Sequence, residues 1–567
     1  MKELDVFENW PFKVPNVEKV KAKEKEMIEA LKNAKDEVEA LKIVKKFFKE
    51  GNKVDNEFTH ISVLYSIDTR VKKYEKAMDL LNEQLPELQA LSVEFKKAVI
   101  ESKYRPYLEK KLGSFLFKMY DYSLRSFNDS IIEDSVEENK LTMEYSKTIA
   151  SAKIEFRGNT YNLPQMGKFM QDLDRNTRIE ASKAYYGYLE TIKDKLEDIY
   201  DKLVKVRDRM AKKLGYKNYV ELAYINMSRY DYNEADVKGY RKQINEVVTP
   251  LVEKLVKAQL KRINVKDPHI YDLNLSFADG NPIPLGTTED KIKNAQKMYD
   301  EMSKETSEFF KFMDEHHLLQ LEAKEGKQSG GYMTYFPVYQ TPIIFSNFNG
   351  TSGDVDVLTH EFGHAFQGHL AKDIKIPEYH MPTMESCECH SMSMEFFAHP
   401  YMGYFFDNPE KYKYQHLADS ISFLPYGVTV DHFQEWVYEN PEATKAERDA
   451  KWHELEELYT PYKVRYYKDN NYLMEGHRWL LQSHIFTSPF YYIDYTLAQV
   501  IAFQFFNLDR KNHELAWKRY ISLCKNGGKY PFRDLIKKAH LKDPFVDGTI
   551  KATITPLIKE LKNYKID

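Results

Sequence analysis

The chain has 567 residues with 83 Lys and Arg against 87 Asp and Glu, and its formal net charge of −4 gives no electrostatic footprint for nucleic acid or an anionic membrane. The hydrophobic fraction of 42% and the aromatic fraction of 14% exclude a disordered chain. With only 22 glycines and 22 prolines, collagen-like, linker-like and turn-dense all-β folds are disfavoured.

Most of the chain is predicted to be helical. Residues 16–51 alternate Lys with Glu and carry apolar residues three or four positions apart, with Gly51 as the predicted C-terminal stop. Residues 56–110 and 185–260 continue this pattern, and their high Lys and Glu content also favours helix. We interpret the charge runs as solvated helix faces rather than binding patches.

Two segments interrupt the helical pattern. The first, at residues 153–163, predicts a β-hairpin with a two-residue turn at Gly158-Asn159. The second comprises residues 330–337 and 341–350, which predict two strands directly before the most informative helix of the chain.

That helix contains His360-Glu361-Phe362-Gly363-His364, an H-E-x-x-H motif for which composition alone predicts about 0.08 chance matches. Residues 351–356 offer helix N-cap candidates. On a helix the two histidines stand one turn apart on one face, so both can reach one Zn²⁺ ion at roughly 2.0–2.1 Å. Glu361 lies next to them as a candidate general base. The alternative is a core helix with two hydrogen-bonded histidines.

A catalytic zinc ion needs a third protein ligand. Glu385, Glu388, Ser391 and Glu395 follow at steps of three, three and four, so they share one face of a predicted helix. One Glu can bind the metal while the others orient the histidines. A solvent-exposed face is the alternative, but Phe and Met residues surround this segment and no Lys or Arg occurs between residues 381 and 402.

These motifs resemble those of the zinc metallopeptidases of the thimet-oligopeptidase and oligoendopeptidase F family, and most closely the oligoendopeptidase F branch. The family follows H-E-F-G-H with a helix of pattern D-x-x-E-x-P-S-x-x-x-E, which implies that Glu388 binds zinc. Glu385 stands at the Asp position and His390 at the Pro position. Gln367 stands where many relatives have a third His.

The resemblance extends over roughly residues 150–560. It includes the segments at 229–241 and 431–438, and a His- and Tyr-rich segment at 484–495. In relatives this last segment lies beside the substrate carbonyl, which implies His484, Tyr492 and Tyr495 as catalytic residues. Tyr495 is the favoured oxyanion donor. Because the chain has 41 tyrosines, packing is the alternative role for each of them.

The resemblance implies a mainly α fold: a two-lobed helical ellipsoid with a deep substrate channel and a small β-hairpin or sheet next to the H-E-x-x-H helix. We expect an N-terminal helical region over residues 1–190 and a catalytic region over 191–567. The resemblance also implies that the protein is a zinc endopeptidase, with one Zn²⁺ per chain, that cleaves short unstructured oligopeptides. The alternative is a carboxypeptidase or dipeptidyl carboxypeptidase, which needs a cation for the substrate's terminal carboxylate.

The two predicted strands before the motif offer a means of binding substrate. An extended peptide can add to a sheet edge through main-chain hydrogen bonds. Gly330 and Gly331 would allow its backbone to approach closely, with Tyr332 beginning the strand. An ordinary hairpin turn is the alternative interpretation of the two glycines.

Other site chemistries are less consistent with the sequence. Di-iron bundles need the E-x-x-H element on two helices together with further glutamate ligands, and apart from Glu361-x-x-His364 the chain has one match, Glu57-x-x-His60, far away in the sequence. A non-catalytic peptide-binding protein would not need Glu361. Cys387 and Cys389 flank Glu388, but residues i and i+2 lie about 200° apart on a helix and cannot face one ion. We interpret both thiols as packing residues.

The location and partners follow from composition. The first twenty residues show no targeting segment, and no stretch approaches the ~20 consecutive apolar residues of a membrane span. Three cysteines are too few for a disulfide framework. We therefore expect a cytoplasmic protein that binds oligopeptides but neither nucleic acid nor membrane, with no obligate protein partner implied.

Overall fold

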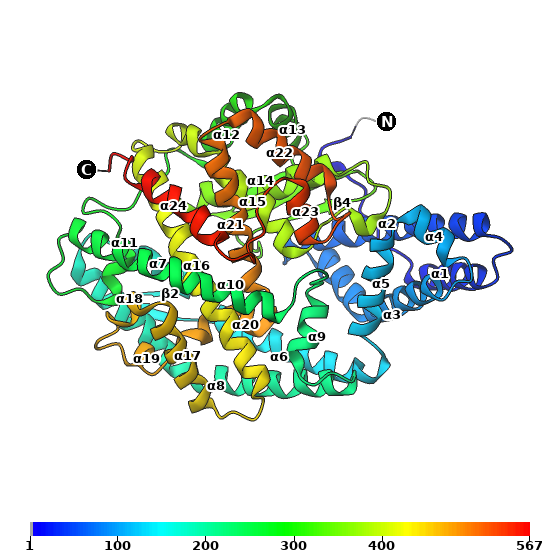
Figure 1. Cartoon of the computed structure of the whole chain (residues 1–567), viewed down its shortest axis with the longest axis horizontal. Coiled ribbons are helices and arrows are strands. Elements are labelled where there is room, and N and C mark those ends of the chain that lie inside the picture. The colour runs from blue at the N-terminus through cyan, green and yellow to red at the C-terminus, as the bar shows by residue number, and fades with distance from the viewer. Residues whose placement is uncertain (1–3, 567) are drawn as a thin grey trace. The chain divides into compact units, whose positions relative to one another are not determined.

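The computed structural model describes residues 4–566, and most of them are helical, as the sequence predicts (Figure 1). The chain divides into two compact units, each assembled from separate stretches of sequence. Unit 1 contains the residues up to 124, 283–409 and 504–541, and unit 2 contains 125–282, 410–503 and those from 542 on. The division into regions at residues 190 and 191 stays a prediction. Among the described residues, no helix has the length and apolar character of a membrane span.

Unit 1 combines helices with a three-stranded sheet. Its elements are η1 (Phe7–Asn9), α1 (Val17–Lys32), α2 (Glu37–Ile67), α3 (Lys72–Ile100), α4 (Arg105–Leu112), α5 (Ser114–Ser126), α12 (Thr288–Met302), α13 (Lys304–Glu315), β3 (Leu319–Glu322), β4 (Tyr332–Phe336), β5 (Thr341–Phe348), α14 (Gly353–Leu370), η4 (Pro377–Tyr379), α15 (Met384–Phe397), η5 (His399–Tyr404), α22 (His513–Asn526) and α23 (Phe532–Lys538).

Unit 2 is helical apart from one hairpin. Its elements are η2 (Asp129–Ile131), α6 (Ile132–Ala150), β1 (Ile154–Phe156), β2 (Asn159–Tyr161), α7 (Leu163–Met170), α8 (Arg175–Lys213), α9 (Tyr219–Asn226), α10 (Glu234–Val247), α11 (Thr249–Arg262), η3 (Ile270–Asn274), α16 (Pro409–Glu439), α17 (Lys445–Tyr459), α18 (Pro461–Val464), α19 (Asn471–Met474), η6 (His477–Leu481), α20 (Ser483–Thr487), α21 (Tyr492–Asp509, which continues into unit 1) and α24 (Thr549–Leu561).

The predicted helix over residues 16–51 is two helices, and the stop at Gly51 is wrong. The chain breaks between α1 and α2, where Asp36 caps α2 by accepting a hydrogen bond from the Glu39 amide at 2.8 Å. Gly51 lies inside α2, with open space around its Cα. The helix continues through Gly51 because the apolar face on both sides of it is buried, for example at Phe48 and Ile61.

The strands predicted before the motif are β4 and β5, joined by β3 in a sheet of order β3-β5-β4. β5 lies in the centre, parallel to β3 and antiparallel to β4. It is buried along almost its whole length, whereas most of β4 is only half-buried. β4 is therefore an edge strand of this sheet, and α14 packs against both β4 and β5.

The predicted hairpin is confirmed, but its turn lies one residue earlier than Gly158-Asn159. Phe156 pairs with Asn159, so Arg157 and Gly158 form the turn. Both have positive φ, 50° and 82°. This matches the two left-handed positions of a type I′ turn.

The N-terminus of α14 is not capped by the residue at its N-cap position. Ser352 makes no side-chain capping bond. Instead, the Asp354 carboxylate accepts hydrogen bonds from the amides of Asn349 and Gly350 at 2.8 and 2.9 Å. It also pairs with the buried Lys291 at 3.5 Å. These contacts fix the loop that connects β5 to the motif helix.

The two motif helices of unit 1, α14 and α15, pack directly against each other (Figure 1). Gly363 makes this approach possible. A Cβ atom added there would lie 2.6 Å from Ser391 Cα and 2.8 Å from the His390 carbonyl oxygen, both on α15. Glycine in the motif therefore brings the face that carries Glu388 close to the two histidines.

Candidate active site

Three candidate metal ligands come together in unit 1. His360 and His364 on α14 both direct Nε2 at the same oxygen of Glu388 on α15, at 3.2 and 3.6 Å. Ligand atoms around a tetrahedral zinc ion, at bond lengths of about 2.0–2.2 Å, lie roughly 3.3–3.5 Å apart. The donor atoms thus have the separation and the composition, two imidazoles and a carboxylate, that suit a zinc ion.

The side chains around this group hold it in place. Glu395 Oε1 lies 2.6 Å from Nδ1 of His360, which leaves Nε2 facing Glu388. Ser391 Oγ donates a hydrogen bond to Glu388 Oε2 at 3.1 Å. In this geometry one glutamate of α15, Glu388, faces both histidines, and another contacts the far nitrogen of His360. The structure gives that outer contact to Glu395, whereas the Glu385 carboxylate accepts a hydrogen bond from Thr383 at 3.0 Å.

The electrostatics of the group favour a bound cation. Burial alone would lower the pKa of His360, but Glu388 and Glu395 more than offset this and raise it well above its usual value. Burial would raise the pKa of Glu388, yet the two histidines hold it well below its usual value. A metal ion bound here would displace the proton of His360, because a histidine ligand must be neutral, and would face the same carboxylates that stabilise that proton.

Glu361 follows His360 on α14 and is buried, with 8% of its surface exposed. It projects about 100° round the helix from His360. Gln367, at the position where relatives have a third His, is buried and donates to the His380 carbonyl oxygen at 3.2 Å. His390 is fully buried, and burial lowers its pKa to about 3, so it is neutral.

The Gly330–Tyr332 segment lies at the start of edge strand β4. Gly330 has a φ of +97°, which a residue with a side chain adopts only under strain, and a Cβ atom there would meet nothing within 4 Å. At Gly331 a Cβ atom would meet the Phe345 carbonyl oxygen of β5 at 3.4 Å. The strand that Gly331 approaches closely is therefore β5 of its own sheet. The Tyr332 ring stacks on Phe345, with 4.8 Å between ring centroids.

The three predicted catalytic residues of unit 2 form one cluster. The His484 ring lies 5.0 Å from that of Tyr492 and 5.8 Å from that of Tyr495, measured between centroids. His484 is on α20, and both tyrosines are in the first turn of α21. Burial raises the pKa of Tyr492 well above its usual value, so its hydroxyl stays protonated and able to donate.

The other sequence segments that carry the resemblance support this cluster. Arg229 donates to the Phe490 carbonyl oxygen at 2.6 Å and pairs with Asp494 at 3.3 Å, fully buried. Gln434 on α16 accepts a hydrogen bond from the Phe490 amide at 2.9 Å. Phe490 has a positive φ of 65°. Two distant segments thus fix the turn between α20 and α21.

A supporting residue that the sequence did not indicate is Gln482. Its Nε2 lies 2.8 Å from Nδ1 of His484, and its Oε1 accepts a hydrogen bond from the Tyr426 hydroxyl at 2.8 Å. With the amide oriented in this way, Gln482 donates to Nδ1, and the proton of a neutral His484 lies on Nε2. The only signal in the sequence for this role is that Gln482, a polar residue, stands two positions before the candidate His484.

Two other groups of three His or acidic side chains in the described part of the chain have donor atoms equally close together: Glu197, Asp449 and His477, and Glu234, Glu435 and Glu439. Each contains at most one imidazole. In the first, Asp449 already accepts a hydrogen bond from Trp479 at 2.9 Å. In the second, Glu435 is already paired with Arg241 and Lys238. The His360 group is therefore the best candidate metal centre.

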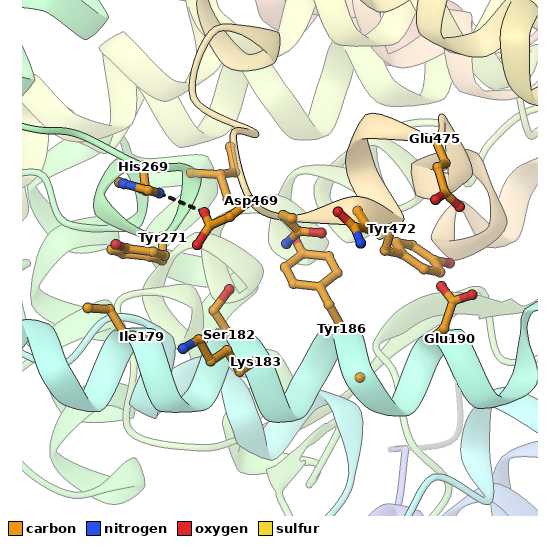
Figure 2. A pocket seen from close by; sticks show the side chains of 14 residues that line it. Ile179, Ser182, Lys183, Tyr186, Glu190, His269, Tyr271, Asp469, Tyr472 and Glu475 are labelled. Carbon is orange, nitrogen blue, oxygen red and sulfur yellow. Dashed lines mark hydrogen bonds and ion pairs between the residues drawn. The ribbon is translucent and has the colours of Figure 1, made fainter.

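A pocket of about 690 Å³ lies in unit 2 between α8, η3 and residues 469–475 (Figure 2). Tyr186, Tyr271 and Tyr472 contribute rings to its wall. His269 and Asp469 are joined by a hydrogen bond of 2.9 Å at one end. None of the candidate metal ligands or predicted catalytic residues lines this pocket, so it is separate from the candidate active site.

Comparison with known proteins identifies the family. The model of the peptidase M3 N-terminal domain matches residues 7–127, and that of peptidase family M3 matches residues 168–554. The first match covers a region outside the sequence resemblance described above. No curated protein matches the chain.

Solved structures of similar proteins agree. Pz peptidase A, in complex with an inhibitor, is 44% identical with a TM-score of 0.93, over 98% of this chain and 99% of that one. A protein assigned as oligoendopeptidase F is 41% identical with a TM-score of 0.93, over 99% of both chains. A third structure, of a Bacillus anthracis protein likewise assigned as oligoendopeptidase F, is 42% identical with a TM-score of 0.88, over 98% of both chains. The chain is therefore a member of peptidase family M3, a metallopeptidase, as its resemblance to oligoendopeptidase F implies.

Proposed function

We propose that the protein is a zinc-dependent endopeptidase that hydrolyses internal peptide bonds of short, unstructured oligopeptides. The observation that carries this proposal is the convergence of His360 Nε2 and His364 Nε2 on one oxygen of Glu388, with Glu395 hydrogen-bonded to the other nitrogen of His360. In this proposal His360, His364 and Glu388 bind one zinc ion per chain. When bound, zinc lowers the pKa of a coordinated water towards ~7 and polarises the substrate carbonyl.

The protein's own residues carry the proton transfers. Glu361 accepts a proton from the attacking water and returns it to the leaving amine, a role suited to a buried carboxylate next to the metal ligands. Glu395 holds the His360 ring so that Nε2 faces the metal position. Glu385 lies on the same face of α15 as Glu388 and Glu395, and it is proposed to stabilise that helix.

The developing negative charge on the substrate carbonyl needs donors. Tyr495 is the favoured donor, with His484 and Tyr492 beside it. Gln482 supports the His484 role, because by donating to Nδ1 it fixes the proton of a neutral His484 on Nε2, the nitrogen proposed to face the substrate. Tyr492, whose pKa is raised by burial, offers a hydroxyl proton at neutral pH.

The substrate backbone is proposed to pair with edge strand β4, beginning at Gly330, Gly331 and Tyr332. β4 pairs with β5 along one edge, and no other described strand pairs with it. Main-chain pairing tolerates many side chains, which suits a peptidase that acts on peptides of varied sequence.

We also place the enzyme in the cytoplasm. Its three cysteines, Cys387, Cys389 and Cys524, are buried free thiols, and none forms a disulfide. Buried thiols that pack as small apolar residues are compatible with a reducing compartment.

Three measurements test the proposal together. Wild-type protein should contain about one zinc per chain, and Glu388→Ala should contain much less; normal zinc content in Glu388→Ala would move the third ligand elsewhere. Quenched peptides of rising length should be cut internally up to a size limit. Mass spectrometry of the products separates this outcome from the alternative of a carboxypeptidase or dipeptidyl carboxypeptidase, which releases only C-terminal fragments.

A further inference from the structure

The cluster of His484, Tyr492 and Tyr495 continues into a second group of side chains through Tyr426 on α16. The Tyr426 hydroxyl donates to Gln482, which in turn contacts His484 Nδ1, each at 2.8 Å. The Tyr426 ring also meets that of Tyr492 edge to face, with 5.7 Å between centroids. Tyr426 is therefore in direct ring contact with Tyr492 and two hydrogen bonds away from His484.

Two cationic side chains lie over the ring of Tyr426. The Arg478 guanidinium carbon is 4.7 Å from the ring centroid, and the Lys463 Nζ is 5.6 Å from it. They come from different elements, η6 and the short helix α18. Arg478 keeps 24% of its side-chain surface exposed, and Lys463 is likewise only partly buried. Both can therefore be reached from solvent.

Of these two cations, Lys463 is the one whose charge the described part of the protein leaves without a direct partner. Among the described residues, Lys463 Nζ makes no ion pair or hydrogen bond, and burial together with Arg478 lowers its pKa to about 7. Arg478 pairs with the fully buried Glu456 at 3.4 Å, and although burial alone would lower its pKa, the surrounding tyrosines and Glu456 raise it well above its usual value. Asp419, whose pKa burial raises to about 6, is near Lys463 without pairing to it.

Lys463, an accessible amine near a second cation, is costly to keep charged unless an anion joins it. A planar guanidinium can bind a carboxylate through two parallel hydrogen bonds, and an ammonium adds a point charge. A partly buried setting strengthens both interactions, because nearby water screens them less. The missing partner is thus a carboxylate of the kind that every unmodified peptide carries at its C-terminus and that Asp and Glu carry on their side chains.

We propose that Arg478 and Lys463 form a carboxylate-binding subsite of the substrate surface, which holds the C-terminal carboxylate or an acidic side chain of the bound peptide. This inference rests on the proposed function, because His484 connects the subsite to the substrate carbonyl. By fixing the position of that carboxylate, the subsite influences which bond is cut.

The test uses four zinc-loaded enzymes and two pairs of quenched peptides. The enzymes are the wild type, Lys463→Met, Arg478→Lys and, as the control, Arg465→Met, which removes an exposed cation paired with Glu253. One peptide pair differs in a C-terminal carboxylate or amide. The other pair is amidated in both members. One member has Glu, and the other has Gln, at each position within a few residues of the cleaved bond.

We expect Lys463→Met and Arg478→Lys to raise KM about 10-fold for the carboxylate-bearing member of one pair and to leave the neutral member unchanged. Arg465→Met should match the wild type on all peptides. A loss confined to the first pair identifies the C-terminal carboxylate, and a loss confined to the second identifies an acidic side chain. Equal effects on charged and neutral peptides, or no effect, would overturn the proposal.

A binding measurement separates this inference from the proposed function. In a Glu361→Gln background, fluorescence anisotropy gives the Kd of each labelled peptide without any turnover. Carboxylate-dependent binding that Lys463→Met abolishes would support the subsite even if the wild type cut no peptide. Conversely, normal endopeptidase activity with no carboxylate preference in Kd would reject the subsite and leave the proposed function standing.

Discussion

Replacing Gly363 with alanine should weaken zinc binding although Gly363 is not a ligand. The new Cβ would lie 2.6 Å from Ser391 Cα, 2.8 Å from the His390 carbonyl oxygen and 3.0 Å from Met394 Cβ. Two of these atoms are backbone, so no side-chain rotation relieves the clash. α15 has to move away by several tenths of an ångström to reach an ordinary contact of 3.4 Å.

That movement acts on the metal site because Glu388 is on the same helix, three residues before Ser391. Overpacking of this kind costs roughly 1–3 kcal/mol, and alanine recovers only about 0.5–1 kcal/mol through its better helix propensity. We therefore expect a net loss of about 1–2 kcal/mol in unfolding free energy. We also expect at least about 10-fold weaker zinc affinity, as for other changes that displace ligands.

Gly51→Ala is the matched control, because Gly51 is also inside a helix but has no atom within 4 Å of its added Cβ. It should stabilise the protein by about 0.5–1 kcal/mol and leave zinc affinity unchanged. The assays are zinc titration against a competing chelator and denaturant unfolding. If Gly363→Ala binds zinc like the wild type and is equally stable, the reasoning about the helix contact is refuted.

Five further substitutions test separate parts of the proposed site and of the cationic pair. Glu361→Gln should keep about one zinc per chain and lose about 10²–10⁴-fold in kcat; retained turnover would exclude the general-base role. Glu395→Gln should weaken zinc affinity about 10- to 100-fold in chelator competition, since it weakens the support of His360. Tyr495→Phe should lower kcat about 10²–10³-fold at unchanged zinc content, and an equal loss in Tyr492→Phe alone would make Tyr492 the main donor instead. Because the folded-state pKa of Lys463 is lowered to about 7, its charge destabilises the fold most below pH 7 and progressively less up to its usual pKa of 10.5. Lys463→Met should therefore raise Tm more at pH 6.5 than at pH 9.5, and a pH-independent difference would contradict the burial of this amine.

The candidate ligands could be predicted because their geometry is local. A spacing of four on α14 places His360 and His364 on one face, and the steps of three and four on α15 do the same for Glu388 and Glu395. Which glutamate stands behind His360 depends on how the two helices cross. That crossing is set by Gly363, whose role is visible only once α15 is in place.

The mainly α fold class was also predictable, because helical patterns are local in the sequence. Several helix and strand boundaries were not. The break before α2 does have a sequence signal, Asp36 followed three residues later by Glu39, but the apolar pattern of residues 16–51 continues through it and hides the break. The strand β3, Leu319–Glu322, is too short to show any alternation and pairs with β5 only through a tertiary contact.

The cationic pair could not be found from the sequence at all. Arg478 and Lys463 come from separate segments, and neither belongs to a recognisable motif. They become a pair only because both lie over Tyr426, a residue of a third helix. The sequence left open which cation could bind a substrate carboxylate, and tertiary structure supplies a candidate.

His360, His364 and Glu388 are proposed to bind the catalytic zinc ion. Anomalous diffraction at the zinc absorption edge, from crystals of the zinc-loaded enzyme, locates that ion. We expect one strong peak about 2.0–2.2 Å from His360 Nε2, His364 Nε2 and a Glu388 oxygen. A peak among Glu197, Asp449 and His477 with none at the α14–α15 site would contradict it.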